Sequence, residues 1–227
     1  MKNMLRFFSI SCFLLLFISC VGGGKNTIPI EALQTNSISG VKKALESGAD
    51  INAPYRSYDN LTPLGVTINE HNFELAKFLI KNGAEINTPG ASVMFVACGQ
   101  TNSVDMVAFL LEHGAEIDGR NFTGSTPLMS AVTLSEYQNP EPLIALLIQK
   151  GASVNARDNQ GWTPLMHAAS QHEEVSLKIM NLLIESGVDI GARNKDNQTA
   201  LDVAIDHGPP KNAAFLSKKA AEINKKN

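Results

Sequence analysis

The sequence predicts an all-α solenoid of short paired helices, stacked in a row behind an N-terminal targeting segment. Two motif series recur in one register and set the repeat. A glycine followed by Ala or Val occurs at positions 48, 83, 114, 151 and 187, with spacings of 31 to 37 residues. A Thr or Ser that opens an apolar stretch occurs at positions 62, 92, 126, 163 and 199. Repeats of this period stack because each unit buries its apolar face only against its neighbours.

The first 19 residues have the composition of a secretion signal. Lys2 and Arg6 supply positive charge, and residues 7–18 are mostly apolar. This run meets glycines at positions 22 to 24, so it falls short of the ~20 apolar residues that span a bilayer. We therefore expect residues 1–19 to be removed as a signal peptide.

Cys20 is the candidate lipidation site. The apolar run ends in Leu-Phe-Ile-Ser-Cys, which resembles a bacterial lipobox, although Phe17 replaces the usual Leu, Val or Ile. The resemblance implies a diacylglycerol anchor in the cell envelope, at the periplasmic face of the outer membrane or at the cell surface. Residues 20–28 would then form the lipidated N-terminus and a flexible tether. An ordinary cleavable signal and a retained anchor are the alternatives.

Each repeat is expected to contain two helices. A Thr before Pro caps a helix with its side chain, and Pro fits the first helical position because its missing N–H would have no partner there. Downstream apolar residues at three-to-four spacing, such as Leu75, Phe78 and Leu79, mark a second helix with one buried face. The glycine that follows suits a left-handed residue at the end of that helix.

The Thr-Pro-Leu series, in phase with the Gly-Ala-Asp series, closely resembles the ankyrin repeat, whose period is about 33 residues. The resemblance covers residues 29–217 in about six units, including two caps. It implies helix pairs joined by short β-turn fingers. The finger between the second and third units is three residues shorter than the next one. Residues 218–227 are a basic tail, which we interpret as a solvated helical end or as a contact for anionic lipid.

Composition and spacing exclude several chemistries. A net charge of −3 gives no basic field for nucleic acid. His167 and His172 are five residues apart and miss the spacing of a zinc-binding helix. Cys98 follows an apolar stretch and suits a buried position. Glu173 and Glu174 suit a solvated surface. We therefore expect no catalytic activity, metal or cofactor.

The family resemblance places the partner-binding positions around the turn of each finger. Trp162 is the only tryptophan, and an aromatic side chain on an exposed edge offers a large contact area. Partial burial against neighbouring fingers is the alternative. The candidate binding residues are Tyr58, Phe122, Thr123, Asn159, Gln160, Trp162, Lys195 and Asp196. We expect a monomeric scaffold that binds another protein; the alternative is an inhibitor or immunity protein that neutralises an envelope-acting enzyme or toxin.

Overall fold

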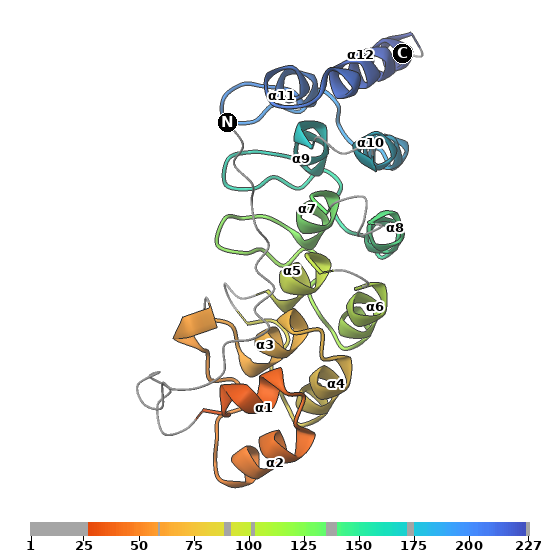
Figure 1. The fold of residues 1–227 in the computed structure, drawn as a ribbon. Coiled ribbons are helices and arrows are strands. Elements are labelled where there is room, and N and C mark those ends of the chain that lie inside the picture. The colour runs from red at the N-terminus through yellow and green to blue at the C-terminus, as the bar shows by residue number, and fades with distance from the viewer. Residues whose placement is uncertain are drawn as a thin grey trace, which may run out of the picture.

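The computed structural model describes residues 27–58, 60–88, 92–100, 103–134, 140–171 and 175–225. These residues contain twelve α-helices, which pair and stack in one row (Figure 1). The predicted all-α repeat solenoid is confirmed. The predicted signal peptide, Cys20, His172, Glu173 and Glu174 lie outside the described residues.

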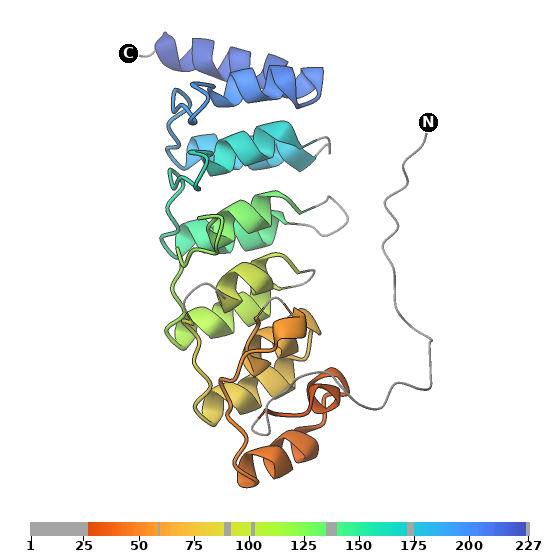
Figure 2. The same cartoon turned by 90° about the vertical axis from the view of Figure 1, so that its left-hand side faces the viewer.

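The helices form two columns, with the fingers projecting beside the inner column (Figures 1 and 2). The inner helices are α1 (Ile30–Gln34), α3 (Pro63–Asn69), α5 (Val93–Cys98), α7 (Pro127–Val132), α9 (Pro164–Ser170) and α11 (Ala200–Asp206). The outer helices are α2 (Ile38–Glu46), α4 (Phe73–Lys81), α6 (Val104–Glu112), α8 (Glu141–Gln149), α10 (Val175–Glu185) and α12 (Pro210–Asn224). A short 3-10 turn, η1 (Arg56–Tyr58), lies in the first finger.

The predicted helix starts and stops are confirmed. A hydroxyl side chain caps α3, α5, α7, α9 and α11 by accepting a hydrogen bond from a backbone N–H three residues on; the caps are Thr62, Ser92, Thr126, Thr163 and Thr199. The glycine after each of the first five outer helices has a φ between 84° and 93°. An L side chain rarely adopts this conformation, so glycine ends these helices with little strain.

The arms that lead from each outer helix to the next finger are joined side chain to backbone. Four residues after a helix-ending glycine stands an Asn or Asp whose side chain accepts a hydrogen bond from a backbone N–H of the next arm. Asn87 illustrates the arrangement, with Oδ1 2.9 Å from the Glu116 nitrogen. The other acceptors are Asn52, Asp118 and Asn155. These bonds fix the distance between successive units.

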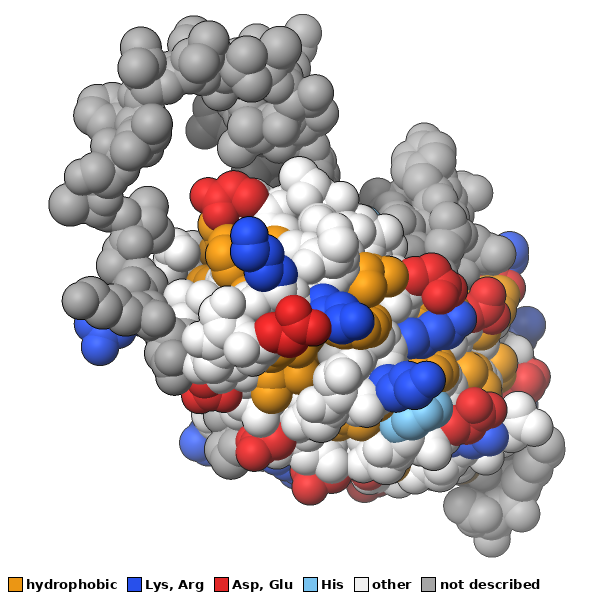
Figure 3. Space-filling view, turned by 90° about the horizontal axis from the view of Figure 1, so that it is seen from below, with side chains coloured by type: hydrophobic (Ala, Val, Ile, Leu, Met, Phe, Trp, Pro, Cys, Tyr) orange, Lys and Arg blue, Asp and Glu red, His pale blue; other side chains and the backbone are white. Residues whose placement is uncertain are grey.

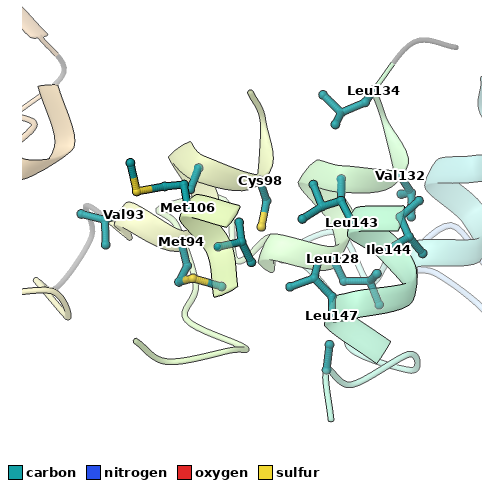
Figure 4. Packing of buried hydrophobic residues seen from close by; sticks show 14 of the residues in the cluster. Val93, Met94, Cys98, Met106, Leu128, Val132, Leu134, Leu143, Ile144 and Leu147 are labelled. Carbon is teal, nitrogen blue, oxygen red and sulfur yellow. The ribbon is translucent and has the colours of Figure 1, made fainter. Parts of the chain in front are cut away.

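Buried apolar side chains from successive pairs form one continuous cluster along the stack. Figure 4 shows a section in which Cys98 of α5 lies on the side of α7, with Leu128 of α7 beyond it and Leu143 and Ile144 of α8 nearby. Cys98 is fully buried, as its sequence context predicts. Burial raises the pKa of its thiol far above the ordinary value, so the nucleophilic thiolate is strongly disfavoured.

Two expected boundaries are corrected by the structure. Ile28 is fully buried and its carbonyl accepts a hydrogen bond from the Tyr55 hydroxyl, while Thr27 forms a β-bridge with Asp50. Residues 27 and 28 therefore belong to the folded domain and not to a tether, because the first finger packs on them. At the other end, α12 runs without a break to Asn224, so position 218 marks no structural boundary.

Candidate protein-binding surface

The fingers at residues 121–125, 158–162 and 194–198, here called the C-terminal fingers, share one turn. In the middle finger the Asp158 carboxylate accepts hydrogen bonds from the N–H groups of Gln160 and Trp162, at 2.8 and 2.9 Å. Asn121 and Asn194 make the same pair of bonds in their own fingers. The fourth turn position has a φ of 62° to 78° and is occupied by Gly or Asn, which tolerate it.

Neighbouring C-terminal fingers are hydrogen-bonded to one another through the predicted binding residues. The backbone N–H of Asn159 donates to the Thr123 carbonyl at 2.9 Å, and that of Lys195 donates to the Gln160 carbonyl at 3.0 Å. The Asn159 side-chain amide also donates to the Phe122 carbonyl, at 3.1 Å. These bonds hold the finger tips at fixed spacing, so the tips form one preorganised edge.

Arginines reinforce this edge, and the sequence interpretation missed them. Arg120 donates to the carbonyls of Gly124 and Arg157, at 2.7 and 2.6 Å. Arg157 donates in turn to the Arg193 carbonyl, and Arg193 donates to the Asn197 carbonyl. The sequence signal is an Arg directly before the Asn or Asp that opens each C-terminal finger. The guanidinium groups thus fix the backbone of the fingers through hydrogen bonds to its carbonyls.

Most of the predicted binding side chains are exposed on the finger edge. Phe122 is 82% exposed, compared with 64% for Ile205 on α11. Five polar side chains on the same edge are exposed as well: Thr123, Asn159, Gln160, Lys195 and Asp196. Tyr58 lies apart from them, in the first finger. It is half-buried and its hydroxyl accepts a hydrogen bond from the Gln34 amide.

Trp162 is only half-buried at the base of its finger, so it offers less free area than an exposed edge residue would. Its ring packs on the core and lies 5.2 Å from the His167 ring. His167 Nε2 lies 3.1 Å from Asp158 Oδ2. Burial lowers the pKa of His167 below its ordinary value, although the neighbouring carboxylate acts in the opposite direction. This grouping stabilises the turn and gives His167 a packing role in the finger.

A hollow of about 300 Å³ opens between the first finger, α5 and the finger that carries Phe122. We call it the α5 hollow; it is lined by Leu61, Asn69, Phe95, Val96, Asn121 and Phe122, among others. Of these residues only Phe122 was identified from the sequence. The available signal was the shortened spacing before Ser92.

Charge on the described helices is distributed unevenly. The inner helices contain three acidic residues and no Lys or Arg, whereas the outer helices contain eight Lys and seven acidic residues. Figure 3 shows acidic and basic side chains mixed over the described surface at the N-terminal end of the stack. Within the part of the chain that the structure describes, no three metal-ligating side chains cluster, and no helix is long and apolar enough to cross a bilayer.

These features define a helical-repeat solenoid with a preorganised row of turns. A family profile described as "Ankyrin repeats (3 copies)" matches residues 30–121, 68–158 and 134–227. The chain belongs to the ankyrin repeat family, as its motifs predict. Ankyrin repeats are protein-interaction modules, and the family is typically one of non-enzymatic binding scaffolds.

Known relatives match part of the chain. An ankyrin repeat protein of Borreliella burgdorferi is 32% identical over 110 residues, which cover 47% of this chain and 48% of that protein. Ankyrin repeat protein FPV031 of fowlpox virus is 35% identical over 112 residues, which cover 48% of this chain and 33% of that protein. The chain thus spans about half the length of these relatives or less.

One solved structure matches over a longer stretch. It contains the Bd0816 predatory endopeptidase from Bdellovibrio bacteriovorus in complex with immunity protein Bd3460. A chain of this complex is 25% identical, with a TM-score of 0.68, over 86% of this chain and 100% of that chain.

Proposed function

We propose that this protein is a monomeric, non-catalytic scaffold that binds another protein through its finger edge at the bacterial cell envelope. The edge carries the proposal: Phe122, Gln160 and Lys195 are exposed on tips that neighbouring fingers hold at fixed spacing. A preorganised surface loses little conformational freedom on association, so more of its contact energy appears as affinity. Membership of the ankyrin family and the near-neutral charge favour a protein partner over nucleic acid.

Attachment through a lipid on Cys20 is the second part of the proposal. It rests on the lipobox-like sequence that ends the apolar run. Mass spectrometry of the membrane fraction should find a mature chain that begins at Cys20 and carries diacylglycerol. A Cys20→Ser variant should leave that fraction. A mature chain that begins elsewhere and stays in the soluble fraction would contradict the anchor and leave the binding role untouched.

A second candidate function is inhibition of an envelope-acting enzyme, as an immunity protein does. The similarity to a chain in the endopeptidase and immunity protein complex favours it, because the match covers all of that chain. An inert solenoid inhibits by covering an enzyme's substrate cleft with its finger edge. Purified protein should then reduce the partner's activity at a one-to-one ratio. If the partner keeps full activity in the complex, the scaffold function stands and the inhibitor function is excluded.

The binding role is tested by affinity purification from envelope extract with the full chain as bait, followed by affinity measurement on the recovered partner. Phe122→Ala should weaken binding by about thirtyfold, since truncation of an aromatic hot-spot residue costs about 2 kcal/mol or more. Gln149→Ala changes an exposed residue at the end of outer helix α8 and serves as the matched control. Equal loss in both variants, or loss in the control alone, would move the binding surface off the fingers.

A further inference from the structure

At two places along the stack, an amide at the start of an outer helix ties its unit to the unit before it. Asn72 precedes α4, and its Nδ2 donates to the carbonyl of Leu33 in α1, at 2.8 Å. Asn212 lies in the first turn of α12 and donates in the same way to the carbonyl of Ala169 in α9, at 3.0 Å. Both acceptors are the last residue but one of an inner helix.

Ser103 occupies the matching place before α6, and there the tie is missing. Its side chain is shorter than that of Asn, and it does not cap its own helix either. Ser103 is only 6% exposed. Two buried side-chain oxygens in the described part of the chain have no hydrogen-bond partner, Ser103 Oγ and Thr88 Oγ1. Thr88 lies where the chain passes from α4 towards α5. Both unpaired hydroxyls therefore weaken one place, the α4/α5 junction, where α3 and α4 meet α5 and α6 (Figure 1).

Packing across the α4/α5 junction is also incomplete. A pocket of about 320 Å³ lies there, with Ile68 and Phe73 on one side and Ala97 and Met106 on the other. A pocket between two packed elements marks contacts that neither element makes. The outer helices do meet across the junction, through an edge-to-face pair of the Phe73 and Phe109 rings at 5.6 Å.

The parts of the chain on either side of the junction are each tied internally. In the N-terminal part, the Tyr55 hydroxyl donates to the carbonyl of Ile28, and Asn72 joins α4 to α1. In the C-terminal part, backbone bonds join neighbouring C-terminal fingers. The junction thus separates two parts, residues 27–88 and residues 92–225, that are each held together more completely than they are held to one another.

The junction is tied at one end of α6 and untied at the other. In the arm that follows α4, Asn87 Nδ2 donates to the Gly114 carbonyl at 2.8 Å, and its Oδ1 accepts the Glu116 N–H at 2.9 Å. Gly114 and Glu116 follow the C-terminal end of α6, whereas Ser103 precedes the N-terminal end. Separation that starts at Ser103 therefore leaves the arm as the last connection.

We propose that the stack opens at the α4/α5 junction, with residues 27–88 separating as one unit from residues 92–225. Opening gives the Ser103 hydroxyl water as a partner, which it lacks in the closed stack. Two repeat units cannot bury their apolar faces alone, so residues 27–88 unfold once they separate. The C-terminal fingers lie wholly in the other part and stay in place. A partner that also contacts residues 27–88 would bind the closed form alone and shift the chain towards it.

Hydrogen exchange of the full chain, read by mass spectrometry of its peptides, tests the proposal without any partner. Amides of α2 and α4 should share one level of protection, at least tenfold below that of α9, with a step between α4 and α5. Protection that rises gradually from α1 to α6 would show fraying from the end of the stack. Equal protection in all helices would show unfolding of the whole stack at once. Either pattern would overturn the proposal.

Ser103→Asn supplies the missing amide and should slow exchange in α4 at least fivefold, with exchange in α9 unchanged. Ser37→Asn is the matched control. Ser37 precedes α2 as Ser103 precedes α6, but no unit of the described chain lies before it, so this change should leave α4 unaltered. Equal slowing of α4 by both substitutions, or slowing of α9 along with α4 in Ser103→Asn, would contradict an opening at this junction.

Ser103→Ala decides the matter where Ser103→Asn leaves exchange unchanged because the larger side chain does not fit. Removal of a buried hydroxyl that has no partner relieves its desolvation cost, so exchange in α4 should again become slower. Faster or unchanged exchange in Ser103→Ala would show that the hydroxyl is already satisfied, and the proposal would fail. Circular dichroism establishes that each variant is folded before exchange is measured.

Discussion

The C-terminal fingers and the first finger are held in place by different kinds of hydrogen bond. Each C-terminal finger repeats an Asn or Asp that binds its own turn, and backbone bonds join one finger to the next. The first finger is longer, contains η1, and is held by side chains: Tyr55 reaches Ile28, and Tyr58 reaches Gln34. Regular repeats thus form a uniform rigid edge, and departures from the repeat produce the chain's particular surface, including the α5 hollow beside the first finger.

The largest expected effect concerns a buried amide that holds the C-terminal cap. Asn212 is fully buried; its amide donates to the carbonyls of Ala169 and Gln171, and its oxygen accepts the Ser176 hydroxyl. Asn212→Ala leaves several buried polar groups unpaired and should lower the free energy of unfolding by about 3 kcal/mol. Asn72→Ala, at a half-buried residue with one such bond in the N-terminal half, should cost about 1 kcal/mol.

Urea unfolding followed by circular dichroism measures both changes. The comparison between the two ends of the stack fails if the two substitutions cost the same.

The next largest change in stability is expected at the turn position with positive φ in the C-terminal fingers. Gly161 has a φ of 78°, and a Cβ there would lie 3.1 Å from the Lys195 nitrogen. Gly161→Ala should therefore cost about 2 kcal/mol, from left-handed strain and from the close approach of the next finger. Asn197→Gly, at the matching turn position with a φ of 62°, relieves strain and should leave stability within about 1 kcal/mol.

Thermal melting of both variants gives the contrast. A harmless Gly161→Ala would show that the fingers tolerate separation, and the edge would not be preorganised.

A smaller effect is expected in the first finger. Tyr55→Phe removes the hydroxyl that donates to the Ile28 carbonyl and should cost about 1 kcal/mol. Burial, together with the nearby Glu31 carboxylate, raises the pKa of Tyr55 far above its ordinary value. In an alkaline absorbance titration Tyr55 should therefore ionise only as the protein unfolds. Ionisation of every tyrosine at the ordinary pH in the folded protein would contradict this packing.

The smallest effect is a pH dependence that arises at Trp162 and His167. Because burial lowers the pKa of folded His167 below 6.5, the unfolded chain takes up a proton first as the pH falls. Stability should decrease from about pH 6.5 downward through the lowered pKa. In His167→Gln this part of the decrease should be absent. Melting temperatures of both proteins between pH 7.5 and 5 give the difference; parallel curves would contradict the lowered pKa.

The helix pairs could be predicted because caps and stops depend on neighbouring residues in the sequence. The exposure of side chains on the finger edge could not, because it depends on packing between units. Thr163 caps its helix and Gly187 ends another because both depend on adjacent residues alone. The half-burial of Trp162 depends on its packing against the core of the stack. The accessibility of Phe95 depends on neighbouring units, which no local motif describes. For the same reason, the sequence did not decide whether Phe122 is exposed or partly buried.

Hydroxyl-radical footprinting of the chain, alone and with its envelope partner, tests most directly whether the finger edge is the binding surface. The method reports the solvent exposure of individual side chains. Phe122, 82% exposed in the free chain, should lose most of its reactivity in the complex. Phe215, half-buried on outer helix α12, should keep the reactivity that it has in the free chain. Protection of Phe215 with Phe122 still reactive would place the partner on the outer helices and contradict the account.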